Sequence, residues 1–251
     1  MEIQEQAAVA VEPTSFMTRA TNVFASPGEL YDEVSSTPVK TTSWLLPYLL
    51  SILLGILSTI AIANNQSLRD QILGPQRQEI QKKVDEGKMT QEQMERASEF
   101  MESSTMFMTF GIGGSIVVGT VAIFGIPLVL WLISKGMMKA IVGYKKVLEV
   151  YGLATLIGLV GSIVTLLLMH ILDNAHASLG GSLLVMSSYD RSNLAHNLLS
   201  SLNAFTLWQT AIVGLGLAKV SNKPTGPVIG LVFGLWILWT VATSLLGWGW
   251  R

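Results

Sequence analysis

The chain has 251 residues, of which 50% are hydrophobic and only 13% are charged, and its formal net charge is −1. Soluble globular chains carry about a quarter charged residues, so this composition indicates a membrane protein, and the small net charge gives no case for a nucleic-acid partner. The absence of cysteine excludes disulfides, thiolate metal sites and cysteine nucleophiles.

Residues 1–20 are small and polar without periodicity, and we expect them to form a disordered tail. The first 40 residues contain no apolar core of signal-peptide length, so we expect the N-terminus to be retained. A short amphipathic helix is predicted next, because Ser26 and Glu29 have capping-box spacing and Pro27 stands at the first helical position. It either lies on the membrane surface or packs on the bundle. Its residues include Phe24, Ser26, Pro27, Glu29, Leu30 and Tyr31.

Five long apolar stretches lack Asp, Glu, Lys and Arg. A hydrocarbon core about 30 Å thick needs about 20 helical residues, and lipid offers no partner to an unpaired backbone group. Each stretch therefore predicts a transmembrane helix. The predicted spans cover about residues 44–63, 106–134, 150–170, 197–218 and 226–248. We expect an all-α, polytopic membrane helix bundle that forms one domain over residues 21–250.

Residues 66–102 predict an extramembrane helical hairpin inserted between the first two spans. This segment holds 14 of the 33 charged residues of the chain. Its apolar stripe is interrupted at Gly74-Pro75, a turn is expected at 85–88, and Thr90 with Gln93 makes a capping box. The hairpin is either a docking surface for a partner or a solvated spacer.

Lysine and arginine in short loops predict the orientation. The basic residues on one side are Lys40, Lys135, Lys139, Lys145, Lys146, Lys219 and Lys223, against Arg191 and Arg251 on the other. This bias places the N-terminus in the cytoplasm and the C-terminus outside. The hairpin then lies outside with six basic residues, interleaved with eight acidic ones.

Small residues recur at four-residue spacing in two of the spans, and this spacing allows helix backbones to approach closely. They are Gly226, Gly230 and Gly234 in the fifth span, and Gly111, Ser115 and Gly119 in the second. Tight packing within one bundle is the favoured interpretation, and the seam of a homo-oligomer is the alternative.

His170, Asp173 and His176 form the one candidate metal site, since imidazole and carboxylate suit zinc or manganese. Hydrolase, nucleotide and dinucleotide motifs are absent, and we predict neither an enzyme nor a cofactor. The middle of the spans holds no charged side chain that would serve as a proton or ion relay. A polar path past Ser162, Thr165, Asn203 and Gln209 would still suit a channel or transporter subunit.

Three segments resemble the Yip1 domain, a five-span membrane domain. They are Phe24-Ala-Ser-Pro-Gly-Glu-Leu-Tyr31 followed by Trp44-Leu-Leu-Pro47, then Gly143-Tyr-Lys-Lys-Val-Leu-Glu-Val-Tyr-Gly152, and Asn203-Ala-Phe-Thr-Leu-Trp208 followed by Gly214-Leu-Gly-Leu-Ala218. The resemblance implies five spans, a cytoplasmic N-terminus and no enzymatic activity.

Eukaryotic relatives bind Rab-type GTPases, but the chain lacks their D-L-Y-G-P signature, and Glu29-Leu-Tyr-Asp32 matches it only in part. The chain is more similar to prokaryotic members, some of which accompany export or ABC-transport systems. The resemblance thus implies a scaffold or assembly factor in a prokaryotic cytoplasmic membrane, with the lipid bilayer and other membrane proteins as partners. A transporter or channel subunit, or a lipid-handling protein, is the alternative.

Overall fold

The computed structural model describes residues 13–190 and 192–245, which form ten α-helices and two short 3-10 helices. The helices are α1 (Phe16–Ala25), α2 (Pro27–Ser36), α3 (Thr42–Ala63), α4 (Gln66–Asp85), α5 (Gln91–Glu102), α6 (Ser104–Gly136), α7 (Tyr144–Ile171), α8 (Leu194–Ser201), α9 (Ala204–Val220) and α10 (Thr225–Leu245), with 3-10 turns at Gly181–Leu184 and Met186–Ser188. The predicted all-α class is confirmed, since the described residues contain one isolated β-bridge and no longer strand. Residues 1–12 of the predicted tail, Arg191, Arg251 and the end of the fifth predicted span lie outside the described residues.

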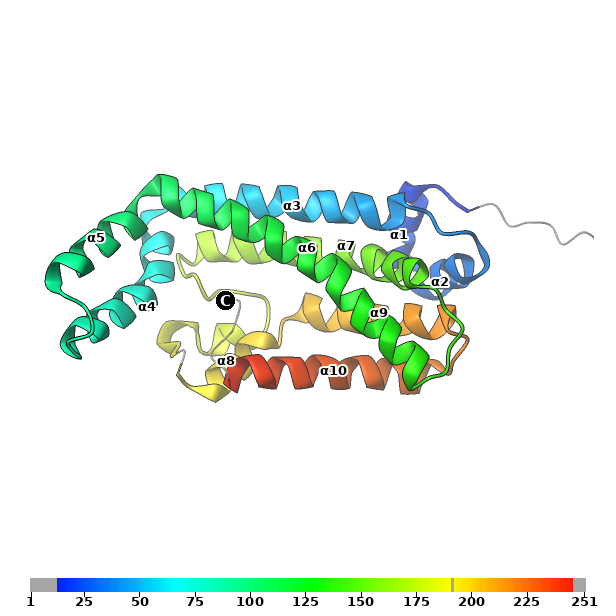
Figure 1. Ribbon diagram of the computed structural model, residues 1–251. Coiled ribbons are helices and arrows are strands. Elements are labelled where there is room, and N and C mark those ends of the chain that lie inside the picture. The colour runs from blue at the N-terminus through cyan, green and yellow to red at the C-terminus, as the bar shows by residue number, and fades with distance from the viewer. Residues whose placement is uncertain (1–12, 191, 246–251) are drawn as a thin grey trace, which may run out of the picture.

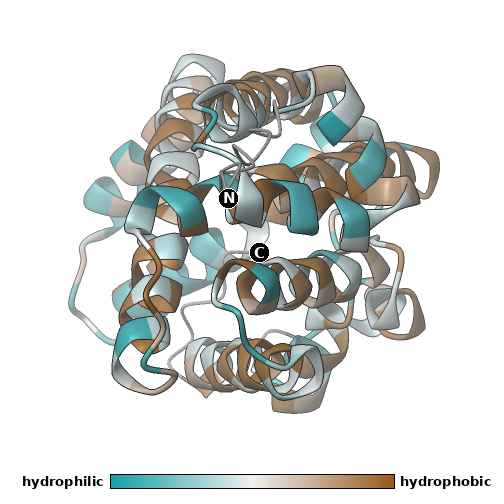
Figure 2. Ribbon diagram, turned by 90° about the vertical axis from the view of Figure 1, so that its right-hand side faces the viewer, coloured by the Kyte–Doolittle hydropathy of each residue, from teal (hydrophilic) through white to brown (hydrophobic). Residues whose placement is uncertain are grey.

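The bundle consists of long helices that run side by side (Figure 1). Four of them, α3, α6, α7 and α10, are long and apolar enough to cross a membrane. Their outer faces carry exposed apolar side chains, such as Leu53 and Leu57 on α3 and Val117 and Val121 on α6. Seen end-on, these helices are predominantly apolar (Figure 2). A surface of this kind is stable in lipid rather than in water.

The fifth apolar helix, α9, is shorter than predicted. The sequence suggested one helix over 197–218, but α8 ends at Ser201 and α9 begins at Ala204. The break has a local cause: Asn203 caps α9, because its side-chain oxygen accepts the backbone N–H groups of Phe205 and Thr206. The 17 residues of α9 span roughly 25 Å at helical rise. The structure thus has four helices long enough to cross a membrane and one shorter apolar helix, α9, which is roughly consistent with the prediction of about five spans.

Two helices precede the first span, and the first of them was not predicted. Helix α1 begins at Phe16, inside the segment expected to be disordered, and the side chain of Ser15 caps it. Ser26 joins α1 to α2 but makes no side-chain capping bond, so the capping box predicted from Ser26 and Glu29 does not form. Pro27 does occupy the first turn of α2.

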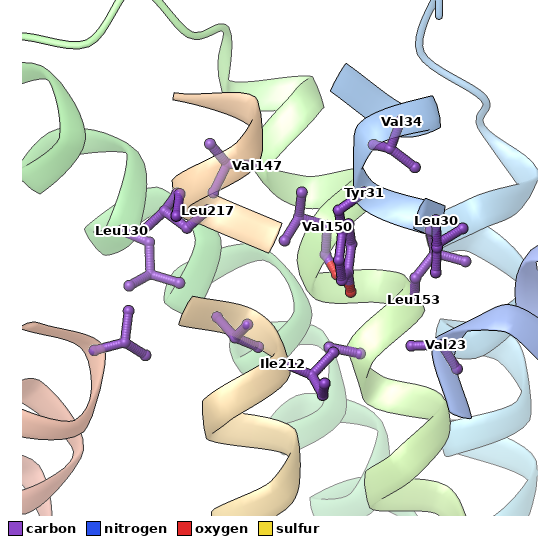
Figure 3. Packing of buried hydrophobic residues seen from close by; sticks show 14 of the residues in the cluster. Val23, Leu30, Tyr31, Val34, Leu130, Val147, Val150, Leu153, Ile212 and Leu217 are labelled. Atoms are coloured by element: carbon purple, nitrogen blue, oxygen red, sulfur yellow. The ribbon is translucent and has the colours of Figure 1, made fainter. Parts of the chain in front are cut away.

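Helix α2 packs on the bundle, which was the second of its two predicted placements. Leu30, Tyr31 and Val34 have no exposed surface. They join a cluster of buried residues from α7 and α9, which includes Val150 and Leu217 (Figure 3). Phe24, the last aromatic residue of α1, is partly exposed and contacts the edge of Trp208, with ring centroids 5.7 Å apart.

The α4–α5 hairpin projects from the opposite end of the bundle (Figure 1). Its predicted turn and the Thr90–Gln93 capping box are both present, and Gly87 takes a left-handed φ of 68° in the turn. The interruption of the apolar stripe at Gly74-Pro75 does not break the helix, because α4 runs continuously from Gln66 to Asp85 with Pro75 inside it.

Candidate functional site: a buried charge network

Arg19 of α1 is the centre of a polar network inside the bundle. Its side chain is fully buried, and its guanidinium reaches four side chains from three other elements. Nη1 donates to Glu149 Oε1 at 2.6 Å and to Ser43 Oγ at 3.0 Å. Nη2 donates to Glu33 Oε1 at 2.9 Å and to Thr37 Oγ1 at 3.2 Å, and Nε donates to the same Glu33 oxygen at 3.1 Å. Arg19 therefore ties α1 to α2, to α3 and to α7.

Glu149, in the second turn of α7, is the fully buried anion of this network. Besides Arg19, it accepts the backbone N–H of Lys40 at 2.9 Å and the Lys146 ammonium at 2.8 Å. Lys146 also donates to the carbonyl oxygens of Val34 at 2.8 Å and Thr37 at 2.9 Å. The end of α2 is thereby bonded directly to the start of α7.

Charges in the network balance, since Arg19 and Lys146 face Glu33 and Glu149. Buried ions are tolerated when they are paired and their remaining hydrogen-bonding groups are satisfied, as here. Removing one partner of a buried pair destabilises a protein by about 3–5 kcal/mol, because an unpaired charge stays behind. The network holds the N-terminal helices in one position, and its two central side chains have no solvent-accessible surface for a substrate.

Glu33 lies at the edge of the network, where its side chain is 14% exposed. Burial opposes ionisation of this carboxyl, but hydrogen bonds from the Thr14 amide and hydroxyl and from Arg19 outweigh it and hold the pKa of Glu33 below its ordinary value. Lys40 also bonds the residues that precede α1, because its ammonium donates to the carbonyl oxygens of Pro13 and Thr14.

Three glycines allow close approach between helices, of α7 to α3, of α9 to α10 and of α9 to α2. A methyl group at Gly152 of α7 would collide with the backbone of Trp44, and one at Gly216 of α9 would lie 2.8 Å from the Tyr31 ring. A methyl group at Gly214 would lie 2.8 Å from the Cα of Ile229 in α10. Tyr31 fills the space beside Gly216 and donates its hydroxyl to the Val150 carbonyl at 3.1 Å.

The glycine stripes singled out from the sequence fall into two groups. Tight packing holds for the second span: a methyl group at Gly111 would strike Thr59, one at Gly119 would strike Ile52, and Ser115 lies against Gly55. The predicted tight packing within one bundle is not found at the three glycines of the fifth span. At Gly226, Gly230 and Gly234 an added methyl group would meet no described atom within 4 Å.

The candidate metal ligands are not brought together. His170 Nδ1 lies 2.8 Å from the Leu166 carbonyl oxygen, and the ring of His176 stacks on Tyr189 with centroids 4.0 Å apart. Asp173 has a φ of 45° at the end of α7, where its carbonyl oxygen accepts the Gln71 amide. Across the described residues, no group of three His, Asp or Glu side chains has the geometry to hold a metal ion.

The four residues named for a polar path lie in or next to one cavity. A cavity of about 240 Å³ is lined by Ser162, Thr165 and Asn203, three of these four residues. Gln209 lies against Gly158, which also lines this cavity. A second cavity of about 310 Å³ shares Thr165 and Asn203 with the first. The two therefore lie side by side around the N-terminal end of α9.

The charge network was missed in the sequence for an identifiable reason. Arg19 was assigned to the tail, and Glu149 stands immediately before the predicted third span, where a charged residue is expected. The one available signal was the spacing of Lys146 and Glu149, three residues apart at the start of a helix. Nothing local indicates a partner 130 residues away.

Together, the apolar bundle and the docked N-terminal helices define a polytopic, all-α membrane protein. A family model described as the Yip1 domain matches residues 21–248, and the chain belongs to the Yip1 domain family. Arg19 stands two residues before the matched segment. No curated protein and no solved structure matches the chain.

Proposed function

We propose that this Yip1-domain protein is a non-enzymatic scaffold or assembly factor for other components of a prokaryotic cytoplasmic membrane. The observation that carries the proposal is the α4–α5 hairpin, which extends beyond the bundle (Figure 1). Helix α5 has no buried residue; Met94, Ala97, Ser98 and Met101 are partly covered, and its other residues are exposed.

Helix α5 presents two different faces. Met94, Ala97, Phe100 and Met101 fall on one face at helical spacing, and Phe100 is 49% exposed. The other face carries acidic residues, including Glu92, Glu95 and Glu99. Phe100 is exposed on the apolar face, whereas Met94, Ala97 and Met101 are partly covered. An exposed aromatic side chain on an apolar face bordered by charge is typical of a protein-binding helix.

The base of the hairpin is fixed to the bundle. Arg77 of α4 bonds Asp70 at 3.0 Å and Glu102, the last residue of α5, at 3.1 Å. Gln71 donates to the Asp173 carbonyl at 2.9 Å and accepts the Ala175 amide at 2.9 Å. A fixed base gives a docking helix a defined direction, which lowers the entropic cost of binding a partner.

The test compares the intact chain with a variant in which residues 66–102 are replaced by a short Gly/Ser linker. Both are purified in mild detergent from the same cells, and co-purifying membrane proteins are quantified by mass spectrometry. The proposal expects the variant to insert normally and to lose its partners. Retention of every partner would show that the hairpin does not dock them.

Paired point variants then identify the face. Met94→Ser with Phe100→Ser changes the apolar face, and Glu92→Gln with Glu99→Gln is the matched control on the acidic face. If the Met94→Ser/Phe100→Ser variant loses its partners and the control keeps them, the apolar face is the binding face.

We also propose that the N-terminus lies in the cytoplasm and the hairpin outside, as the lysine distribution in the short loops favours. Because the chain has no cysteine, single cysteines at Lys88 and Lys139 report the two sides. In intact cells a membrane-impermeant maleimide should label the first and spare the second. The reverse pattern would invert the proposed orientation.

The paired cavities around α9 favour a second candidate function, transport or lipid handling. Their lining hydroxyls, including Thr165 and Thr206, would accommodate a polar head group without any charged side chain. Thr165→Val with Thr206→Val keeps the volume and removes the hydroxyls. Lipid exchange between vesicle leaflets should be faster with the protein than without it, and slower with this variant. Equal rates with and without the protein would exclude the second candidate.

A further inference from the structure

The loop between α6 and α7 exposes apolar side chains on the face of the protein that carries α1 and α2. Met137 is 70% exposed and Ile141 is fully exposed. Ala140 and Val142, the two neighbours of Ile141 in the sequence, are buried. The loop is fixed rather than loose. The Trp131 indole donates to the Val142 carbonyl at 3.0 Å, and the Ala140 amide donates to the Ser134 carbonyl at 2.9 Å. The fold therefore maintains the exposure of Met137 and Ile141.

Three exposed lysines surround these two side chains: Lys135, Lys139 and Lys145. None of them forms an ion pair with a described carboxylate. On this face Glu33 and Glu149 are paired with Arg19, Glu149 also with Lys146, and Asp32 with Lys219.

This face as a whole is positive among the described residues, with eight basic side chains against four carboxylates. The basic residues are Arg19, Lys40, Lys135, Lys139, Lys145, Lys146, Lys219 and Lys223, and the carboxylates are Glu29, Asp32, Glu33 and Glu149. The excess positive charge includes the three loop lysines, which no described carboxylate neutralises.

Aromatic residues mark the depth of the loop in the bilayer. Trp131 and Tyr144 contact each other edge to face, with ring centroids 6.1 Å apart, and such residues concentrate at the level of lipid head groups. Lys135 lies over the Trp131 ring, 4.7 Å from its centroid. The exposed apolar surface of α6 includes Leu128 and Leu132 and continues to Met137.

We propose that the α6–α7 loop binds anionic phospholipid head groups in the leaflet adjoining the N-terminal helices. Met137 and Ile141 enter the acyl-chain boundary, while Lys135, Lys139 and Lys145 pair with the phosphates. Continuity with the lipid-facing surface of α6 identifies lipid as the occupant, and the unpaired lysines require that the lipid be anionic. This interaction does not depend on the proposed function of the hairpin, which lies at the other end of the molecule.

The electrostatic contribution predicts the size of the effect. A lysine near an anionic membrane surface contributes about a fivefold preference, so three lysines give on the order of a hundredfold. The preference should weaken as the salt concentration rises, because the Debye length shortens.

The test uses the full-length protein, delipidated in detergent and incubated with equal amounts of phosphatidylglycerol and phosphatidylcholine. Retained lipids are counted by native mass spectrometry. We expect selective retention of phosphatidylglycerol, which K135Q/K139Q/K145Q should reduce by roughly a hundredfold. The matched control is K82Q/K83Q/K88Q in the hairpin, which removes the same charge at the opposite end and should retain the lipid as the unaltered chain does. M137S/I141S should weaken retention of both lipids.

Three results would overturn the proposal. One is equal retention of the two lipids by the unaltered chain, which would point to a protein partner for the loop. Another is an unchanged preference in the loop variant, and a third is an equal loss in the hairpin control. If the loop variant fails to fold, the salt series on the unaltered chain decides instead, because a preference that does not change with salt is not electrostatic.

Discussion

Substituting Arg19 by methionine should release the N-terminal helices from the bundle. The substitution removes both ion pairs of Arg19 and leaves Glu149 buried with Lys146 as its one remaining charged partner. Loss of one member of a buried pair costs about 3–5 kcal/mol, so the population of the detached state should rise on the order of 10²- to 10⁴-fold.

Thiol labelling can measure this opening, because the chain contains no cysteine of its own. Val34 has no exposed surface and packs in the core that α2 shares with α7, and a cysteine there resembles it in size. The labelling rate of the Val34→Cys chain in detergent then reports the fraction of molecules in which α2 is detached. Arg19→Met should raise this rate by the factor given above.

Two further variants make the interpretation specific. Arg96→Met removes an exposed arginine, which pairs with Glu92 on the hairpin, and should leave the labelling rate unchanged. Arg19→Met combined with Glu149→Gln should label more slowly than Arg19→Met alone, because the uncompensated buried charge is gone. A rate for Arg19→Met within about threefold of the unaltered chain would refute the reasoning, since about threefold corresponds to well under 1 kcal/mol.

Three other predictions concern acid, helix contacts and the hairpin. The pKa of Glu33 in the folded chain lies below the ordinary value of a glutamate carboxyl, so its stabilisation is complete above that ordinary value and is lost as the pH falls through the folded pKa. Amide exchange of α1 and α2, corrected for the intrinsic effect of pH, should therefore accelerate in acid, and a Glu33→Gln chain should lose this dependence. Gly152→Ala should lower the thermal unfolding temperature in detergent, because the new methyl group meets the backbone of Trp44, whereas Gly230→Ala meets no described atom and should not lower it. A drop for Gly230→Ala as large as for Gly152→Ala would show that the α10 glycines are packed against a partner. Thr90→Ala removes the cap of α5 and should destabilise the hairpin by about 1 kcal/mol, seen as faster amide exchange confined to α5.

The membrane helices could be predicted because lipid imposes a local rule. A span must be about 20 residues long and free of charge, and both properties can be counted along the chain. The Thr90–Gln93 capping box is equally local, since both of its hydrogen bonds join residues three apart. These features need no knowledge of what packs against them.

The remaining features depend on contacts between distant segments. Arg19 and Glu149 are 130 residues apart, and nothing near either residue indicates the other. The four-residue spacing of glycines occurs in α6 and in α10 alike, but only the α6 residues lie against another described helix. The Ser26–Glu29 spacing also predicted a local capping bond, but the Ser26 side chain does not form it.

The docking of α1 and α2 also has a consequence for biosynthesis. These helices leave the ribosome first, but the surface that buries Leu30, Tyr31 and Val34 belongs to α7 and α9, which begin at Tyr144 and Ala204. The N-terminal helix pair must therefore wait until the later helices α3, α6, α7 and α9 have been made. During this interval its apolar face is uncovered, and the adjacent bilayer surface is the nearest place to bury it. The N-terminal helix pair is thus a membrane-surface element while the chain is nascent and a core element once the chain is complete, and its docking marks the end of folding.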